Sequence, residues 1–151
     1  MSSQNVTVLI QQTPDAEDLP IPGYATPGAA GMDLFAAVDT DIVLLPGERK
    51  LISAGIRLAI PEGYEGQVRP RSGLALRHGI SMVNSPGTID SDYRGVVQII
   101  MINQGQEPFT VGRGDRIAQL VIMPVIQAAL VRADELPETA RNEGGFGHTG
   151  V

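Results

Sequence analysis

Glycine and proline recur so often along this chain that every regular element between them must be short. The 151 residues include 18 glycines and 11 prolines, and both residue types interrupt helices and strands. The runs between them are rich in Val, Ile and Leu, which favour strands. Many short strands separated by turn residues are typical of sandwiches, jelly rolls and barrels. We therefore predict an all-β fold, a distorted jelly roll or sandwich-like barrel, with one short helix.

The turn residues divide the sequence into expected strands and that one helix. The helix is expected over residues 72–79, with Ser72 as its N-cap and Gly79 as the residue that ends it. Gly55 is expected to join two paired strands, at residues 50–53 and 56–60. Further strands are expected at residues 6–10, 42–45, 66–69, 79–83, 96–102, 109–111, 116–123 and 125–131.

The length favours one domain followed by a short tail. A single domain of 151 residues buries about two-thirds of its unfolded surface. From Arg132 onward, acidic residues, proline and glycine dominate, and such a segment cannot bury apolar surface of its own. We predict a β domain over residues 1–136 and a flexible C-terminal arm over residues 137–151.

Composition argues against several classes of function. The sequence has no cysteine, which removes disulfides, thiolate nucleophiles and zinc–thiolate sites. No apolar run approaches the roughly 20 residues that span a bilayer, and the first residues lack the pattern of a secretory signal. The net charge of −6 and the short Lys/Arg runs argue against nucleic-acid binding. We therefore expect a cytoplasmic protein that binds neither membrane nor nucleic acid.

Residues 84–95 form the most polar interruption between two apolar runs, and these runs are predicted to be the arms of a β-hairpin. The segment holds the Asn84 amide, the acids Asp90 and Asp92, and the ring of Tyr93. A chain reversal alone does not require these groups, so a polar pocket at the hairpin would explain them. An ordinary loop with an Asx turn explains the segment equally well when it is taken alone.

Three shorter stretches carry polar groups in unexpected places. Arg71, Ser72 and Gly73 lie at a strand-to-helix junction, where an arginine, a hydroxyl and backbone N–H groups can cradle an anion. A capped helix with a surface arginine is the alternative. Asp33 stands in an alanine-rich apolar run, where it either holds an arginine or contacts the hydration shell of a metal. Gln119 interrupts an apolar strand, where it serves either a site or a structural hydrogen bond.

The C-terminal tail contains one aromatic residue that no local core can use. Phe146 stands among glycines, where it suits stacking on a planar ligand once the tail closes, and Arg141 and Thr149 can contact phosphate. An unstructured terminus is the alternative explanation. The two histidines, His78 and His148, are too few and too far apart in the sequence for a metal triad.

Five segments together resemble the five ordered motifs of the trimeric dUTPases. They are residues 30–36, 70–75, 87–95, 114–120 and 141–150, and they follow the family's order from about residue 30 to the end of the chain. Any one of them is unspecific, whereas the set of five is highly specific. One departure is His148, where many relatives carry Ser, and a histidine makes a phosphate contact sensitive to pH near neutrality.

The resemblance implies a homotrimer of jelly-roll subunits whose active sites are shared between subunits. It implies Mg²⁺-dependent hydrolysis of dUTP to dUMP and pyrophosphate through attack of water on the α-phosphorus. Such an enzyme lowers dUTP and supplies dUMP for thymidylate synthesis. A metal held mainly by the substrate's phosphates agrees with the lack of a dense carboxylate cluster in the sequence.

The resemblance also implies roles for individual residues. Uracil enters the hairpin, Tyr93 packs under the deoxyribose, and Phe146 of another subunit's arm closes on the base. Asp90 and Gln119 are the expected catalytic residues, of which Asp90 activates the water, and Asp33 is the expected metal contact, through water. The expected substrate-binding residues are Arg71, Ser72, Gly73, Asn84, Thr88, Ile89, Asp90, Tyr93, Gln98, Arg141, Phe146, Gly147, His148 and Thr149.

Two other functions stay open on the sequence. A dCTP deaminase-like or bifunctional deaminase–diphosphatase shares this fold but uses a glutamate positioned for deamination. Here the pocket acid is Asp90, and no glutamate lies between Glu65 and Glu107. A non-catalytic nucleotide-binding trimer is the other alternative. Ammonia release from dCTP, or pyrophosphate release from dUTP, separates these functions.

Overall fold

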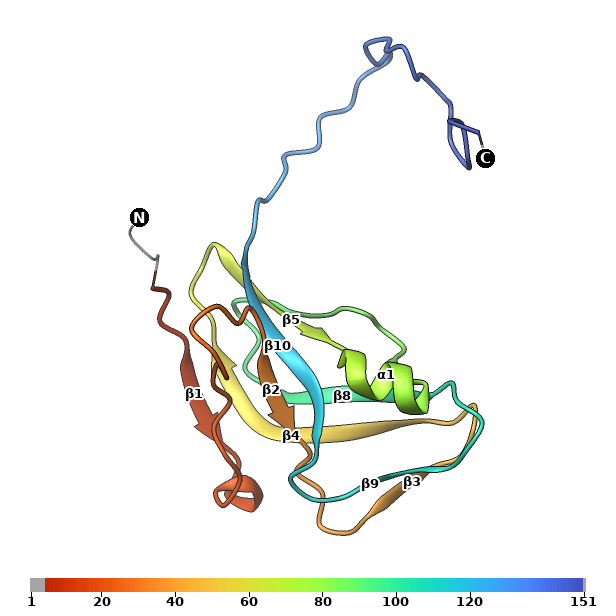
Figure 1. The fold of residues 1–151 in the computed structure, drawn as a ribbon. Coiled ribbons are helices and arrows are strands. Elements are labelled where there is room, and N and C mark those ends of the chain that lie inside the picture. Colours follow the sequence, from red (N-terminus) through yellow and green to blue (C-terminus); the bar gives the residue numbers. More distant parts are fainter. Residues whose placement is uncertain (1–4, 151) are drawn as a thin grey trace.

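The computed structural model describes residues 5–150, in which strands make up most of the regular structure (Figure 1). This confirms the predicted all-β class with one short α-helix. In chain order the elements are β1 (Leu9–Gln12), the 3-10 helix η1 (Pro14–Ala16), β2 (Met32–Phe35), β3 (Ile42–Leu44), β4 (Arg49–Ala59), β5 (Tyr64–Arg69), α1 (Ser72–His78), β6 (Ile80–Met82), β7 (Gly87–Ile89), β8 (Val96–Asn103), β9 (Phe109–Val111) and β10 (Arg116–Pro124). The first strand lies closer to the following turn than the expected residues 6–10, and neither β2 nor β7 was among the expected strands.

The strands form two four-stranded antiparallel sheets that share one aliphatic core. The first sheet has the order β1-β4-β8-β6 and the second the order β2-β10-β5-β7, while β3 and β9 form a separate pair. Leu34 and Leu120 of the second sheet belong to the same buried cluster as Ile52, Ile99 and Met101 of the first. Each of these side chains is at most 2% exposed, and burying each stabilises the fold by roughly 1.5–3 kcal/mol. The two sheets therefore form one hydrophobic unit.

A β-bulge at Gly55 replaces the predicted turn between two strands. The expected strands at 50–53 and 56–60 are one continuous strand, β4, whose register with β8 shifts between Ser53 and Arg57. Gly55 has a φ of +65°, and a Cβ atom there would lie 2.8 Å from the Cβ of Ala37. A glycine inside a strand marks a bulge or a close approach as well as a turn. The predicted strand pair is therefore wrong.

Helix α1 is confirmed, although it begins differently from the prediction. Arg71 occupies the N-cap position with extended backbone angles, φ −94° and ψ 129°, and Ser72 is the first helical residue. The prediction of Ser72 as N-cap is wrong because the chain stays extended through Arg71. Gly79 ends the helix as predicted, in the left-handed region. No helix among residues 5–150 is long and apolar enough to cross a bilayer.

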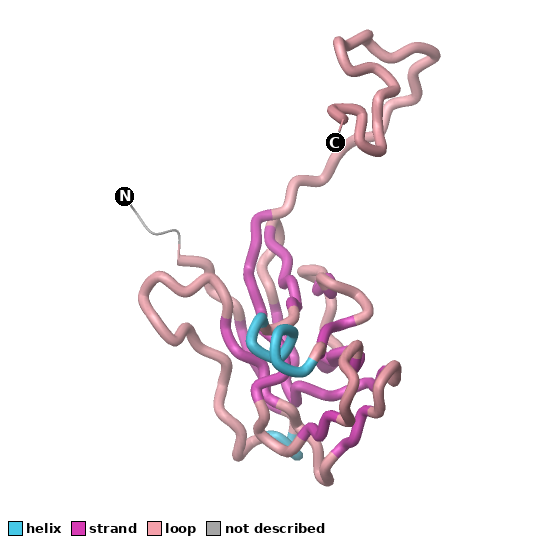
Figure 2. Tube along the Cα trace, turned by 45° about the vertical axis from the view of Figure 1, so that its right-hand side comes forward, coloured by secondary structure: helices cyan, strands magenta, loops and turns pink. Residues whose placement is uncertain are grey.

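Regular structure ends at Pro124, so the predicted strand at 125–131 is wrong. β10 pairs with β5 as far as the Pro124–Tyr64 pair, and β5 begins at Tyr64, so this ladder cannot extend further. The Val125 N–H still donates to the Gly63 carbonyl at 2.9 Å, whereas the later backbone hydrogen bonds, from Gly144 to Arg141 and from Gly150 to Gly147, stay within the arm. Figures 1 and 2 both show the chain beyond this point standing away from the sheets. Its apolar side chains are exposed rather than packed.

Candidate functional site

The polar segment at residues 84–95 joins the two sheets of the sandwich. The strands on either side of it, β6 and β8, pair with Met82 opposite Met101, which confirms the predicted hairpin arms. Between them, β7 leaves the first sheet and pairs with β5 of the second, with Gly87 opposite Val68. The segment therefore crosses from one sheet to the other and back. Because of this crossing, the segment encloses a cavity, whereas a tight turn would leave no space.

A cavity of about 240 Å³ lies at this crossing. Its polar lining comes from Asn84, Thr88, Tyr93 and Gln98, and Ile89 also contributes, so five predicted substrate-binding residues meet there. Apolar walls with a few polar groups are typical of small-molecule sites. Most of the apolar wall could not be predicted from the sequence, because its residues come from strands far apart in the chain: Leu51, Val68, Met82, Val96, Val97 and Ile100.

Tyr93 forms a fixed part of the cavity wall. Its hydroxyl donates a hydrogen bond to the Val96 carbonyl at 3.1 Å. Its ring lies against Gly95, where a Cβ atom would come within 2.9 Å of the Tyr93 Cε2 atom. A larger residue at Gly95 would therefore push the ring away. The cavity is shaped before any ligand arrives.

Asp90 follows directly after β7, and its side chain is exposed. It lines a separate hollow of about 490 Å³ together with Asp92, Glu62 and Glu65. The two glutamates carry no local signal in the sequence, since only the pairing of β5 with β7 brings this part of the chain beside Asp90. No group of three or more His, Asp or Glu side chains among residues 5–150 is arranged to hold a metal ion. An exposed carboxylate here can accept a proton from water.

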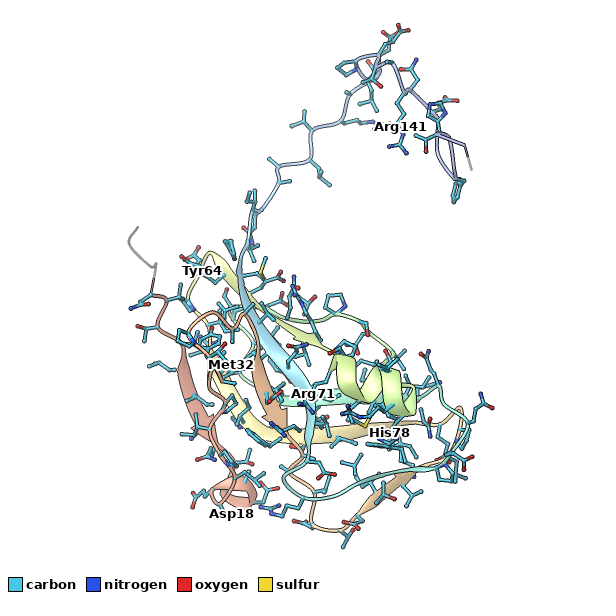
Figure 3. The ribbon with its side chains drawn as sticks, viewed as in Figure 1. Asp18, Met32, Tyr64, Arg71, His78 and Arg141 are labelled. Carbon is cyan, nitrogen blue, oxygen red and sulfur yellow. The ribbon has the colours of Figure 1, made fainter. Side chains whose placement is uncertain are left out.

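Asp33 lies between two guanidinium groups, those of Arg71 and Arg116. Arg71 Nε is 3.0 Å from Asp33 Oδ1, and Arg116 Nη1 is 3.7 Å from Asp33 Oδ2. Arg71 Nη1 also donates to the backbone carbonyl of Arg116 at 3.1 Å. These contacts match the arginine-holding alternative for Asp33, and they fix the direction of the Arg71 guanidinium. Figure 3 shows Arg71 in the sandwich beside the start of α1.

Gln119 lies beside this charged group and is oriented by two contacts. It stands opposite Asp33 on β2 and opposite Arg69 on β5. Its Nε2 donates to the Pro70 carbonyl at 2.9 Å, and its Oε1 lies against Gly31, where any side chain would collide with it. Gln119 therefore makes a structural hydrogen bond and faces the predicted anion cradle.

The other residues of the cradle open helix α1. Ser72 is exposed, and a Cβ atom at Gly73 would lie 2.8 Å from Arg77 Nη2, so only glycine leaves the Arg77 side chain undisturbed. The first N–H groups of a helix have no partner within the helix. The Arg71 guanidinium, the Ser72 hydroxyl and the first backbone N–H groups of α1 therefore belong to consecutive residues of one strand-to-helix junction.

The arm lies apart from both groups of site residues. Arg141 Nε donates to the Gly144 carbonyl at 2.7 Å within the arm, and Phe146 is fully exposed. Figure 3 shows Arg141 far out on the extended segment, away from Arg71. His148 packs its ring against Gly144, also within the arm. Within one chain, the structure does not bring the described arm residues to the hairpin cavity or to Arg71 and Arg116 around Asp33.

The fold and these groups define an all-β protein with a small cavity that has polar and apolar walls and, at a separate place on the chain, a cationic strand-to-helix junction. The family model described as dUTPase matches residues 17–150 of this chain. The chain belongs to the dUTPase family, which confirms the resemblance drawn from its five segments.

Curated relatives carry one shared description, deoxyuridine 5'-triphosphate nucleotidohydrolase. The protein of Thermoanaerobacter sp. (strain X514) is 53% identical over 147 residues, which cover 97% of this chain and 99% of that protein. The protein of Syntrophotalea carbinolica is 64% identical over 130 residues, which cover 86% of this chain and 88% of that protein.

Solved structures that resemble this fold include dUTPases from phages of Staphylococcus. The dUTPase of bacteriophage 80alpha with dUpNHpp has a TM-score of 0.86 and 26% identity, covering 96% of this chain and 99% of that chain. A variant dUTPase of phage phi11, described with the coordination of a structural Mg(II) ion, has a TM-score of 0.76 and 25% identity. It covers 85% of this chain and 97% of that one.

Proposed function

We propose that this protein hydrolyses dUTP to dUMP and pyrophosphate, and that it thereby lowers dUTP and supplies dUMP for thymidylate synthesis. The cavity at the hairpin crossing carries this proposal, because five predicted substrate-binding residues line it. The curated relatives described as deoxyuridine 5'-triphosphate nucleotidohydrolases support the reaction. The phage dUTPase structure with dUpNHpp supports the substrate class.

The cavity suits the nucleoside part of the substrate. Asn84 and Gln98 offer amide groups, and the backbone of residues 88–90 offers peptide groups, so the polar edge of uracil finds donors and acceptors. Tyr93 stands where the sugar follows the base, and its ring excludes a bulkier ribose. A site built for one hydrogen-bonding edge discriminates strongly against another, since the wrong base leaves buried groups unpaired. This explains how uracil would be preferred over cytosine.

The junction at the start of α1 suits the phosphates. Arg71 is aimed by Asp33, while Ser72 and Gly73 contribute a hydroxyl and backbone N–H groups. Gln119, held by Pro70 and Gly31, would help to place phosphate and water. Planar guanidinium groups bind phosphate oxygens in pairs of hydrogen bonds. Together these groups hold the α-phosphorus in position for attack.

Asp90 is the proposed general base. Its carboxylate is exposed and lines a water-accessible hollow beside the cavity. It accepts the proton of the attacking water, whose oxygen forms a bond to the α-phosphorus while pyrophosphate departs with the electrons of the broken P–O bond. General-base assistance contributes about 10²–10⁴-fold, and positioning with electrostatic stabilisation supplies most of the remaining acceleration.

Mg²⁺ is the proposed cofactor, and the donor groups of this chain fit an ion that is bound mainly through the substrate. The chain provides no cluster of three ligands among residues 5–150, and Asp33 is already paired with Arg71 and Arg116. When bound, the ion would neutralise phosphate charge and make the phosphorus more electrophilic. Asp33 is partly exposed and would contact the ion through water, while phosphate oxygens supply the direct ligands.

We also propose a homotrimer whose sites combine parts of different subunits, with residues 1–136 as the β domain and 137–151 as the arm. Residue 151 lies outside the described residues. Two observations support sharing: the arm stands away from its own domain (Figure 3), and several large apolar side chains are exposed in one chain. They include Leu51, Val83, Ile126, Leu130 and Val131. Exposed apolar surface of this kind is typical of subunit contacts.

In that trimer the arm of one subunit would cover the site of another. Phe146 would stack on the base, while Arg141, Gly147, His148 and Thr149 would contact the phosphates. Closure would exclude water from the reacting groups and complete the site. The arm is long enough to reach outward, since its chain is extended beyond Pro124.

One assay tests the proposed reaction. The full-length protein is incubated with dUTP and Mg²⁺, and dUMP, pyrophosphate and inorganic phosphate are measured separately; parallel samples contain dCTP. We expect one dUMP and one pyrophosphate per dUTP, with no ammonia from dCTP. Ammonia from dCTP would support a deaminase instead. Binding of dUTP without any product would identify a non-catalytic nucleotide-binding protein.

A further inference from the structure

Residues 90–95 carry two groups that the proposed reaction needs at fixed positions, the Asp90 carboxylate and the Tyr93 ring. The segment begins after β7 and ends before β8 starts at Val96, so it lies between two strands rather than within a ladder. Its own backbone contributes one turn contact, from the Tyr93 N–H to the Asp90 carbonyl at 3.1 Å. Side chains must therefore supply further contacts if this loop is to keep one shape.

Arg94 supplies two of these contacts from within the loop. Its Nη1 donates to the Ser91 carbonyl at 2.7 Å and to the Tyr93 carbonyl at 3.0 Å. A terminal guanidinium nitrogen carries two hydrogens, so it can donate to both carbonyls at once. The Arg94 side chain thus provides the loop with the hydrogen-bond partners that a neighbouring strand would otherwise provide.

Arg57 adds a contact from strand β4 of the first sheet. Its Nη1 donates to the Arg94 carbonyl at 3.2 Å. Arg57 stands opposite Val96 on β8, and the Val96 carbonyl accepts the Tyr93 hydroxyl. Two guanidinium groups therefore bind three carbonyls of the loop, those of Ser91, Tyr93 and Arg94. Arg57 thereby attaches the loop to the first sheet.

The β-bulge at Gly55 places Arg57 at this position. Before the bulge, Ser53 pairs with Gln98. An unshifted antiparallel ladder would then bring Gly55 opposite Val96, two residues further along each strand, whereas the register shift brings Arg57 there. Glycine has no side chain to reach the loop, while arginine ends in five N–H donors. Bulges beside active sites commonly re-aim a side chain in this way.

The surroundings of Arg57 and Arg94 favour a holding role over contact with a ligand. Within residues 5–150 neither side chain forms an ion pair, whereas Arg71, Arg113 and Arg116 each pair with an aspartate. Both line a hollow of about 340 Å³ beside β1, which shares no lining residue with the hairpin cavity. The carbonyls of the loop are therefore the partners that this structure gives them.

We propose that Arg94 and Arg57 are positioning residues, which hold residues 90–95 so that Asp90 meets the attacking water and Tyr93 closes the sugar side of the cavity. The inference rests on the proposed function and deepens it. A misplacement of about 1 Å at a reacting group can cost about 10²-fold in rate. Loss of these contacts should therefore lower kcat through Asp90 and also weaken the exclusion of ribose through Tyr93.

Steady-state kinetics of the full-length protein with dUTP, and with UTP, which carries the 2′-hydroxyl, test this role. The variants are Arg94→Met and Arg57→Met, which keep a long apolar stem without donors, and Arg94→Lys, which restores a charged donor. Arg49→Met is the control, because it removes the same charge from an exposed position at the start of β4.

Two further measurements separate turnover from binding and folding. Calorimetric titration with dUpNHpp and Mg²⁺ gives the affinity of each variant, and thermal unfolding checks that it folds. If Arg94→Met does not fold, Arg57→Met and Arg94→Lys provide the same comparison with smaller changes.

We expect Arg94→Met to lower kcat for dUTP by about 10- to 100-fold. The preference for dUTP over UTP, measured as the ratio of the two kcat/KM values, should fall by about 10-fold, while dUpNHpp affinity stays near normal. Arg57→Met should move both quantities in the same direction but less, because it removes one hydrogen bond instead of two. Arg94→Lys should regain part of each loss, and Arg49→Met should match the unchanged protein.

Three results would overturn the proposal. Unchanged kcat and dUTP preference in Arg94→Met would show that Asp90 and Tyr93 keep their positions without it. A lowered unfolding temperature with an unchanged dUTP preference would give the two arginines a role in stability alone. A loss of dUpNHpp affinity equal to the loss of kcat, with the preference intact, would make Arg94 a direct ligand contact. A failure of the proposed function differs from all three, because the unchanged protein itself would not hydrolyse dUTP.

Discussion

Leu34 and Phe146 show how differently the β domain and the C-terminal arm treat an apolar side chain. Leu34 is 0% exposed in the core, whereas the Phe146 ring is fully exposed. In the domain, two sheets and their register fix where each side chain points. In the arm, order comes from short local turns: the Thr139 N–H donates to Asn142 Oδ1 at 2.8 Å, and the Asn142 N–H donates to Thr139 Oγ1 at 3.0 Å.

This difference shows what positions the residues of the proposed site in the β domain and in the arm. Tyr93 and Arg71 are positioned within the domain before any ligand binds, because Tyr93 is hydrogen-bonded to the Val96 carbonyl and Arg71 is paired with Asp33. The side-chain hydrogen bonds of the described arm residues stay within the arm, so in the proposed trimer a ligand or another subunit would hold the arm in place. The domain should therefore control stability and chemistry, while the arm should control closure. The following predictions test that division.

The largest effect is expected from Asp90→Asn. Loss of the proposed general base should lower kcat by about 10²–10⁴-fold, while dUpNHpp binding stays near normal because the cavity and the arginines are unchanged. Asp92→Asn is the matched control, since it removes an acid from the same hollow two residues away. Initial rates and calorimetry measure both quantities. A near-normal kcat in Asp90→Asn would remove Asp90 from its proposed role.

Truncation of a buried leucine should separate the two regions by stability. Leu34→Ala should lower the free energy of unfolding by about 2–5 kcal/mol because it leaves a cavity in the core. Leu136→Ala, at a position 83% exposed, should change it by less than about 0.5 kcal/mol. Denaturant titration at constant protein concentration measures both. A large loss in Leu136→Ala would show that the start of the arm is packed in the assembly.

Deletion of the chain from Pro137 onward should leave a folded domain with poor turnover. The core contains no residue of this segment, so the unfolding temperature should change little. Misplaced phosphates and entry of water should lower kcat/KM by about 10²-fold. Normal hydrolysis of dUTP by the truncated protein would make the arm a simple terminus.

A mixing experiment sharpens the truncation result. Asp90→Asn subunits keep an intact arm, and truncated subunits keep an intact Asp90. If sites are shared, unfolding and refolding a one-to-one mixture should restore about one quarter of the sites by random assembly. Light scattering establishes the number of subunits in each sample. No recovery in mixed trimers would show that each arm serves its own subunit.

The smallest effect is expected from the surface pair of Asp18 and Arg113. A side-chain hydrogen bond from Arg113, with Arg113 Nη2 at 2.6 Å from Asp18 Oδ1, lowers the pKa of Asp18 from its ordinary value of 3.8. Because the folded-state pKa is lowered, the pair stabilises the fold above about pH 4, and this contribution disappears as pH falls through the lowered pKa. The free energy of unfolding should therefore differ between the protein and Asp18→Asn near neutral pH, and this difference should disappear only in acid. A difference that persists at low pH would contradict this.

The sequence was informative where local chemistry decides the structure. The all-β class, the hairpin arms and the end of α1 at Gly79 follow from turn residues and apolar runs, and the structure confirms them. The five segments indicated the family because their order and residue types are specific together. These conclusions need no knowledge of which strands are neighbours.

Other features depend on long-range packing, and the sequence could not supply them. Gly55 was predicted as a turn, although it is a bulge packed close to Ala37, and that contact joins distant segments. Residues 125–131 have a strand-like composition but lack a partner strand beyond Tyr64 in this chain. Arg116 lies beside Asp33 next to a register shift between Arg116 and Ala118, and no residue near it in the sequence indicates that shift. The individual site roles remain predictions, which the kinetic experiments address.

The passage of residues 84–95 between the sheets has a thermodynamic consequence. β7 pairs with β5 of the second sheet, whereas β6 and β8 belong to the first sheet. A nucleotide bound at this crossing would therefore contact both sheets. Unfolding would then require its release, so the melting temperature should rise with the logarithm of dUMP concentration once the site is filled. The enzyme's own product would serve as a thermal reporter of site occupancy, even in variants that have lost all turnover.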